Sequence, residues 1–301
     1  MEHIVTMNPT SYMDATGPID YGMTNDYMFR SVLQRNTTVL KGLICSLLHL
    51  NPDDVSSVVI TNPIDPGDDI NAKEFILDIN VLLNNSSTIN LEMQMENQLN
   101  WQDRSLSYLC RSYDQLYRGQ KYTDTKPAIH IGFLNFSPFD DSQEFYATYK
   151  LLNVKNHHLY SDKFILSVVD LTHIELATDE DKANQIDYWA KLFKATSWEE
   201  IRMISKNNNY LSEASQALYE LNADEITRQK CRAREEYYRT ENTYKKMISD
   251  LQAQLQQTIT EKDSAITEKD NAIAEKDNTI TEKDNTISVL MQRIAELEGN
   301  S

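Results

Sequence analysis

The sequence is poor in the residues and patterns that define several protein classes. It holds only seven glycines and seven prolines, which excludes collagen-like and proline-rich chains. No apolar run approaches the roughly 18 residues that span a bilayer. The first residues also lack the basic segment and apolar stretch of a secretory signal. We therefore expect a cytoplasmic protein that does not enter a membrane.

Cysteine is equally scarce. Cys45, Cys110 and Cys231 are far apart and form no CxxC pair, which argues against a disulfide framework and a zinc site and favours buried free thiols. The histidines show no ligand spacing such as HExxH, and no Walker loop or GxSxG elbow is present. The sequence thus gives no support for ATP binding or for serine hydrolysis.

Positive charge is the third shortage, since the formal net charge is −17. Residues 241–301 hold 12 acidic and 7 basic side chains, so residues 1–240 still carry −12. Phosphate groups are repelled by an acidic surface. A nucleic-acid ligand would therefore need a local basic patch, a bound metal ion, or both.

A seven-residue repeat dominates the C-terminal end. ITEKDSA, ITEKDNA, IAEKDNT and ITEKDNT follow one another and place isoleucines seven residues apart from Ile259 to Ile294. This period predicts a coiled coil that forms homo-oligomers through residues 248–301. The seam is thin, because lysine occupies the second apolar position of four heptads, and the successive spacings of four between Leu251, Leu255 and Ile259 interrupt the register. A solvated single helix is the alternative.

The rest of the chain alternates helical and strand-like segments. We expect one or two helices at 25–49, helical segments at 101–118 and 200–247, and strands at 75–83, 88–95, 128–136 and 163–171. This alternation predicts an α/β fold with a mixed sheet flanked by helices. As a division of the chain we expect an N-terminal tail (1–20), a core (21–180), a helical extension (181–247) and the coiled coil (248–301).

Two carboxylates stand out in the predicted hairpin. Alternation along FILDINVLL and INLEMQME puts Asp78 on the polar side of one strand, and Glu92 and Gln94 on that of the next. With the turn centred on Asn85, Asp78 lies across from Glu92, with Cβ atoms roughly 5 Å apart. A Mg²⁺ ion would relieve their repulsion, polarise a phosphodiester and activate a water that Gln94 orients. The alternative is an edge hairpin with a solvent-facing polar side.

The pattern D-x13-E-x-Q formed by these three residues resembles the active site of the PD-(D/E)XK nuclease family transposases, also called Rpn recombination-promoting nucleases. NDYMFRSVL (25–33) is similar to the N-terminal helix of the family. The segment RSLSYLCRSYDQLYRGQKYTDTKPAIHIGFLNF (104–136) resembles its signature after the catalytic strands. The resemblance covers roughly residues 20–240.

This resemblance implies a restriction-endonuclease-like fold and metal-dependent DNA cleavage connected with recombination or transposition. Asp78 and Glu92 would ligate Mg²⁺, with Mn²⁺ as a substitute, and Gln94 stands where the wider superfamily has lysine. A neutral amide cannot supply the positive charge of lysine to a transition state. Asp26 is either an accessory acid or a residue that begins its helix.

A basic strip follows the two strands. Arg104, Arg111 and Arg118 are seven residues apart and would share one helical face. Together with Tyr108 they are candidates for contacting DNA phosphates. In the alternative interpretation the tyrosines pack on the sheet and the arginines pair with acids.

Two further functions stay open. The first is a catalytically weak module that docks DNA or protein and is clustered by its tail, which the acidic charge and Gln94 favour. The second is cleavage of RNA, since two carboxylates and an amide do not distinguish the two nucleic acids.

Overall fold

The computed structural model describes residues 11–62, 79–97, 100–116, 118–139 and 141–298. The chain divides into two compact units, residues 1–236 and residues 237–301. No helix in the described ranges is long and apolar enough to cross a membrane.

Within the described residues, six strands form one mixed sheet in the order β1-β2-β3-β4-β6-β5. The β1-β2, β2-β3 and β5-β6 pairs are antiparallel, and β3-β4 and β4-β6 are parallel. This arrangement confirms the mixed α/β sheet expected from the sequence. The strands are β1 (Val58–Ile60), β2 (Ile79–Leu83), β3 (Ser87–Gln94), β4 (Ala128–Leu134), β5 (Tyr146–Leu152) and β6 (Leu159–Asp170).

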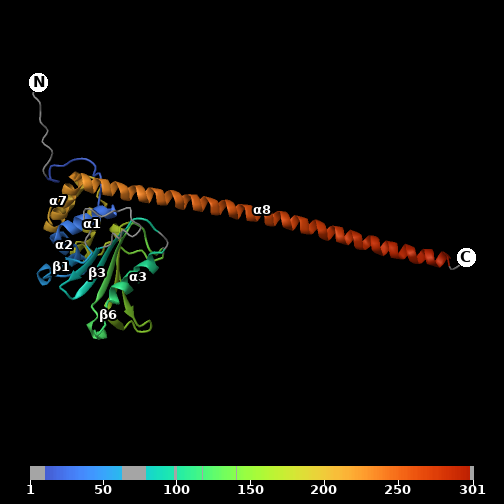
Figure 1. Ribbon diagram of the computed structural model, residues 1–301, viewed down its shortest axis with the longest axis horizontal. Helices are drawn as coiled ribbons and strands as arrows, with labels where there is room; N and C mark the ends of the chain where they lie inside the picture. The colour runs from blue at the N-terminus through green and yellow to red at the C-terminus, as the bar shows by residue number, and fades with distance from the viewer. Residues whose placement is uncertain (1–10, 63–78, 98–99, 117, 140, 299–301) are drawn as a thin grey trace, which may run out of the picture. The chain divides into compact units, whose positions relative to one another are not determined.

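Helices cover both faces of this sheet (Figure 1). One face packs on the helices of the main core, where Phe29 of α1 meets Phe133 of β4 with ring centroids 5.5 Å apart. The opposite face packs on α3, whose Trp101 contacts Leu134 and Val168. The helices are α1 (Asp26–Arg35), α2 (Thr37–Leu47), α3 (Trp101–Tyr113), α4 (Asp179–Ala183), α5 (Ile186–Lys194), α6 (Trp198–Ser205), α7 (Asn209–Ala223) and α8 (Glu225–Glu298), with 3₁₀ turns η1 (Pro52–Asp54), η2 (Tyr122–Asp124) and η3 (Ile174–Leu176).

A tight turn fixes the β2–β3 hairpin. Asn84 and Asn85 both have positive φ, 49° and 52°, and the Ser86 amide donates to the Leu83 carbonyl at 2.9 Å. Asparagine tolerates the left-handed region better than most residues, so these two neighbours favour a hairpin turn. Leu83 therefore pairs with Ser87 around Asn85, which is the turn centre expected from the sequence.

The helix after the hairpin is shorter than predicted. α3 ends at Tyr113, and Asp114 leaves the helical region with φ −86° and ψ 68°. Arg104 and Arg111 share the helix, whereas Arg118 follows its end, so the expected strip of three arginines on one helix is wrong. Strands β1 and β5 were not predicted, and β6 begins at Leu159, earlier than expected.

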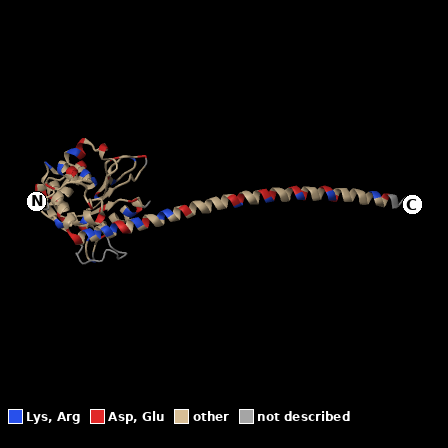
Figure 2. Cartoon of the chain, turned by 90° about the horizontal axis from the view of Figure 1, so that it is seen from above, with Lys and Arg blue, Asp and Glu red and all other residues tan. Residues whose placement is uncertain are grey.

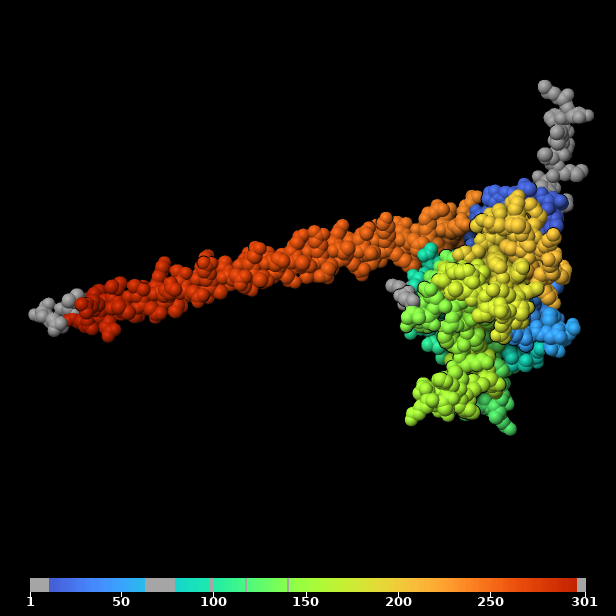
Figure 3. All heavy atoms as spheres, turned by 180° about the vertical axis from the view of Figure 1, so that it is seen from behind, coloured from blue at the N-terminus to red at the C-terminus, as the bar shows by residue number. Residues whose placement is uncertain are grey.

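The β5–β6 hairpin ends in exposed apolar side chains, and its tip stands out from the first unit in the space-filling view (Figure 3). β5 is an edge strand and most of its residues are exposed, so it lacks the alternating pattern that marks a half-buried strand. This explains why the sequence did not predict it.

The cysteines are free, as expected, but they are not all buried. Cys45 and Cys231 lie in the core, whereas Cys110 is exposed on α3. Burial, with Asp26 and Glu235 nearby, raises the pKa of the Cys231 thiol to about 12. Cys231 is therefore protonated and unreactive at neutral pH.

In the second unit, residues 237–298 of α8 form one continuous helix, roughly 90 Å long at 1.5 Å per residue. Charged side chains of both signs are spaced along it between uncharged stretches (Figure 2). The isoleucines of the repeat from Ile259 to Ile294 are all exposed in the single chain. The unit therefore carries an apolar seam that no part of the described chain covers.

Candidate active site on the β2–β3 hairpin

The pairing of β2 with β3 matches the alignment on which the predicted carboxylate pair depends. Ile79 pairs with Leu91 and Asn80 pairs with Asn90. This is the alignment that was assumed in predicting that residue 78 lies across from residue 92. The Asn90 amide also donates to the Asn80 side-chain oxygen at 2.8 Å. Asp78 itself lies outside the described residues.

The polar side of this hairpin is buried. β2 and β3 are interior strands, since β1 borders one and β4 the other. Glu92 is only 4% exposed and Gln94 8% exposed. The alternative of an edge hairpin with a solvent-facing polar side is therefore wrong. A buried carboxylate needs a compensating positive group or hydrogen-bond donors.

Arg104 supplies such a group. Its Nη2 lies 2.6 Å from Glu92 Oε1, and its guanidinium stacks over the Tyr108 ring at 5.4 Å from the ring centroid. Arg104 lies in the first turn of α3, and because α3 packs on this face of the sheet, its side chain reaches Glu92 of the hairpin. Arg111 is exposed further along the same helix and Arg118 is exposed beyond its end. Of the three arginines, Arg104 alone is shown next to Glu92.

Gln94 follows Glu92 on the same face. Its Nε2 donates to the Glu96 carbonyl at 2.9 Å, which fixes the orientation of the amide group. The Oε1 atom therefore remains as the acceptor that a water molecule could use. Gln94 carries no charge, so Arg104 is the cation that the described residues place beside the carboxylate.

The structure adds His130, to which the sequence assigned no role. His130 is fully buried on β4, pairs with Asn90 across the sheet, and has its Nε2 3.8 Å from Glu92 Oε2. Burial, and secondarily Arg104, lower its pKa to about 3. The sequence does show a signal, because His130 is a polar residue inside the apolar run of a central strand. Its contact with Glu92, however, depends on the parallel pairing of β3 with β4, which the sequence does not reveal.

Aromatic rings hold His130 in place. The Trp101 and Tyr108 ring centroids lie 5.5 and 6.0 Å from that of His130. Trp101 reaches this position because residue 132 is glycine, where an added Cβ would lie 2.2 Å from the indole ring. The close approach of α3 to the sheet therefore depends on Gly132.

Asp26 occupies a different environment. It begins α1, and its carboxylate accepts from Arg234 of α8 through Nη2 at 2.6 Å and Nε at 3.2 Å. Both side chains are mostly buried. This contact ties the start of α8 to α1 within the first unit.

Metal-ligating groups converge in pairs but not in threes. Among the described residues, no three His, Cys, Asp or Glu side chains lie close enough together to hold a metal ion. Glu92 and His130 form such a pair on the polar face. A complete ligand set would need water or a side chain from outside the described ranges.

A Ser-Asp-His cluster lies at the carboxyl end of β6 but lacks the geometry of a catalytic triad. Ser137 Oγ and Asp170 Oδ2 both lie 3.1 Å from the same His173 nitrogen, Nδ1. A triad needs the serine and the aspartate on opposite ring nitrogens. Burial raises the pKa of Asp170, but hydrogen bonds from Ser137, Thr172 and His173 lower it further than burial raises it. These hydrogen bonds therefore connect the end of β6 to Ser137, which follows β4.

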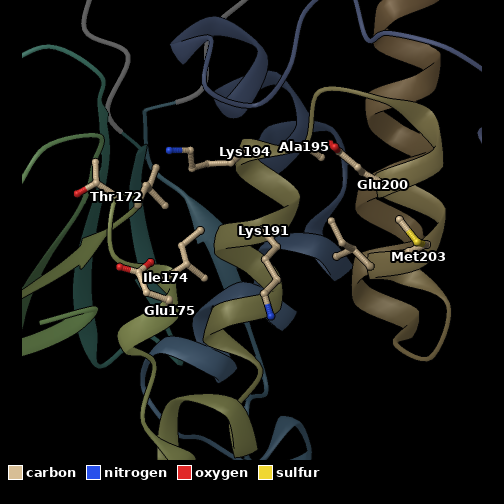
Figure 4. Close-up of a pocket in the computed structure, with 10 residues that line it drawn as sticks. Thr172, Ile174, Glu175, Lys191, Lys194, Ala195, Glu200 and Met203 are labelled. Atoms are coloured by element: carbon tan, nitrogen blue, oxygen red, sulfur yellow. The ribbon is translucent and has the colours of Figure 1, made fainter.

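A surface cavity of about 450 Å³ is found elsewhere, between the end of β6 and helices α5 and α6 (Figure 4). Its lysines, Lys191 and Lys194, point in different directions, and Lys191 pairs with Asp187 at 2.6 Å. Glu200 accepts a hydrogen bond from the Thr196 amide. Its charged groups therefore do not converge on one point, and none of the hairpin residues lines it.

The fold and the hairpin together define an α/β protein with a buried carboxylate, Glu92, on an interior strand of a mixed sheet. Residues 23–247 match the sequence pattern of the PD-(D/E)XK nuclease family transposases, which is most of the chain. The chain belongs to this family. No curated protein and no solved structure is similar enough to match.

Proposed function

We propose that the protein is a metal-dependent DNA endonuclease that hydrolyses phosphodiester bonds during recombination or transposition. The carrying observation is Glu92, a buried carboxylate on a hairpin whose described pairs, from Ile79–Leu91 to Leu83–Ser87, follow the alignment that the predicted pair of Asp78 and Glu92 requires. Family membership supports nuclease chemistry, and the family name supports a connection with transposition.

In this proposal Asp78 and Glu92 hold the divalent ion. The donor chemistry fits, because Mg²⁺ prefers carboxylate oxygens and water, and the pairing of Glu92 with Arg104 indicates that the pocket favours a nearby cation. When bound, a Mg²⁺ or Mn²⁺ ion polarises the phosphodiester and lowers the pKa of a coordinated water.

The neighbouring side chains position the reactants. Gln94, anchored by Glu96, presents Oε1 to the attacking water. Arg104 contacts the phosphate, since its side chain is one-third exposed beside Glu92. Tyr108 supports the guanidinium through its ring, and Arg111 extends the phosphate contact along α3. Because Gln94 lacks the charge of lysine, we expect slow turnover.

Oligomerisation through residues 248–301 is part of the proposal. The exposed seam of isoleucines supports it, since burying an isoleucine contributes about 1.5–3 kcal/mol. An oligomer would also present several acidic centres to one DNA, as cleavage of both strands requires.

A plasmid-cleavage assay tests this function. The purified full chain should nick or linearise plasmid DNA with Mg²⁺ or Mn²⁺ and not with EDTA. Asp78→Asn and Glu92→Gln should each reduce cleavage at least a hundredfold, while Arg111→Ala, on the exposed side of α3, should weaken it only mildly. Equal cleavage by Asp78→Asn and wild type would refute the site, and parallel RNA substrates decide between the nucleic acids.

The second candidate is a module that binds DNA or protein with little cleavage. The observations in its favour are the neutral Gln94 and the ion pair that Arg104 already makes with Glu92. Binding of DNA without cleavage under Mg²⁺ and Mn²⁺, and loss of self-association on deletion of residues 248–301, would favour this candidate.

A further inference from the structure

His130 is a fully buried histidine on β4. Neither of its ring nitrogens has a hydrogen-bond partner within the described residues. Leaving a buried polar group unsatisfied costs about 1–3 kcal/mol, so such groups in native proteins usually contact a ligand, an ion or a water. The ring nitrogen Nε2 faces Glu92.

The distance between these two groups fits a shared ion. His130 Nε2 and Glu92 Oε2 are 3.8 Å apart, which is too long for a hydrogen bond. Bonds from a divalent metal to nitrogen or oxygen are about 2.0–2.2 Å, so two ligands of one ion lie roughly 3–4.3 Å apart. The separation falls inside this range.

The two oxygens of Glu92 face different groups. Oε1 faces Arg104 at 2.6 Å, whereas Oε2 faces His130. An ion at Oε2 therefore does not require Arg104 to leave. The aromatic packing of Trp101 and Tyr108 also fixes the imidazole plane, so the direction of Nε2 is set before any ligand binds.

We propose that His130 coordinates, through Nε2, the same divalent ion as Glu92, so that the site combines nitrogen and oxygen ligands. This inference rests on the proposed metal site. Imidazole suits transition ions, whereas Mg²⁺ favours oxygen ligands. His130 therefore makes the site prefer Mn²⁺ over Mg²⁺.

The test compares wild type, His130→Phe and His158→Phe as full chains. Phenylalanine keeps the ring that packs on Trp101 and Tyr108, and His158 is exposed near the β5–β6 turn, so it controls for the same exchange elsewhere. Calorimetric titrations with Mn²⁺ and with Mg²⁺ give the affinities, and electron spin-echo spectroscopy of bound Mn²⁺ detects a coordinated ¹⁴N.

We expect a ¹⁴N coupling and tighter binding of Mn²⁺ than of Mg²⁺ in wild type and in His158→Phe. In His130→Phe the coupling should disappear and the Mn²⁺ affinity should fall about tenfold or more, with Mg²⁺ affinity changed less than about threefold. Wild-type Mn²⁺ without a ¹⁴N coupling, or a His130→Phe variant with unchanged Mn²⁺ affinity, overturns the proposal. The wild-type spectrum decides even if the variant fails to fold.

The same samples separate this inference from the proposed function. A wild-type protein that shows the ¹⁴N coupling but leaves plasmid DNA intact contradicts the nuclease function and supports the ligand role of His130. A protein that cleaves with Mg²⁺ and shows no coupling supports the nuclease function and contradicts the inference.

Discussion

Arg104 Nη2 and Glu92 Oε1 lie 2.6 Å apart in an ion pair whose two sides differ in burial, with side chains 34% and 5% exposed. Arg104 can therefore move toward solvent or toward a phosphate, whereas Glu92 is fixed inside the sheet. Without Arg104, the buried carboxylate would lose this charge-assisted hydrogen bond. In the proposed function, this asymmetry lets Arg104 pair with Glu92 in the folded protein and also reach a phosphate of the DNA.

The first prediction concerns this pair. Arg104→Ala should lower the free energy of unfolding by about 1–3 kcal/mol in EDTA, because it removes the ion pair that Arg104 makes with a buried carboxylate. Saturating Mg²⁺ should restore part of this loss. Urea denaturation followed by circular dichroism measures both effects. Arg111→Ala, exposed on the same helix, is the control and should change stability by less than about 0.5 kcal/mol. Equal stability of Arg104→Ala and wild type in EDTA would contradict the argument.

The second prediction concerns the contact between Trp101 and Gly132. Gly132→Ala places a Cβ 2.2 Å from the indole ring, so α3 must move away from the sheet. We expect a loss of about 1–3 kcal/mol and weaker DNA cleavage, since Arg104 moves with α3. Gly22→Ala is the control, because its Cβ would meet its nearest neighbour at 3.5 Å. Tryptophan fluorescence and plasmid cleavage report the two effects, and a Gly132→Ala variant with wild-type values for both would show that the contact is dispensable.

Local patterns were enough to predict the hairpin. Alternating apolar residues and the turn at Asn84 and Asn85 fixed both the faces and the pairing, and Leu83 pairs with Ser87 as required. These signals are local, because neighbouring strands joined by a tight turn are aligned by the turn itself. The helical character of residues 25–49 was also predicted, and the structure divides this segment at Asn36, which ends α1 and caps α2.

Long-range neighbours were not predictable from one sequence. His130 meets Glu92 only because β4 pairs with β3 in parallel, after a crossover that contains α3. Arg234 meets Asp26 across more than two hundred residues of chain. Nothing local in either segment specifies such a partner, so the histidine was overlooked and the environment of Asp26 was left open.

The third prediction uses the Asp26–Arg234 pair. Asp26→Ala removes the mostly buried ion pair with Arg234, which should cost about 3 kcal/mol. Asp20→Ala, which breaks the exposed pair with Arg228, is the matched control and should cost under about 1 kcal/mol. At temperatures at which it stays folded, Asp26→Asn should retain cleavage, because the role of Asp26 is to hold the start of α8 against α1. Loss of cleavage in a folded Asp26→Asn variant would instead indicate an accessory acid.

The fourth prediction is a pH dependence. Burial and Arg104 lower the pKa of His130 from 6.5 to about 3, so below pH 6.5 the unfolded chain binds a proton that the folded chain does not. His130 therefore destabilises the fold increasingly as the pH falls from about 6.5 to 3. At pH 5 the effect is about 2 kcal/mol.

Urea denaturation of the metal-free protein at pH 7 and pH 5 measures this effect. Between pH 7 and pH 5, the free energy of unfolding of wild type should fall by about 2 kcal/mol more than that of His130→Phe. The His158→Phe variant, which changes an exposed histidine, should behave as wild type. An identical pH dependence in all three proteins would show that His130 is not held neutral by burial.

The last prediction concerns the seam of α8. Ile266, Ile273 and Ile280 are each about half exposed in the single chain, and one isoleucine per heptad is the least apolar surface that a coiled coil can use. The triple change of these three residues to serine should therefore abolish self-association of the full chain at micromolar concentration. Thr267→Ser with Thr281→Ser, one residue further along the same turns, is the control because it leaves the seam intact. Sedimentation velocity measures the association. A wild-type chain that sediments as a monomer would show that α8 does not form a coiled coil, and a triple variant that associates as well as wild type would show that the seam is not the interface.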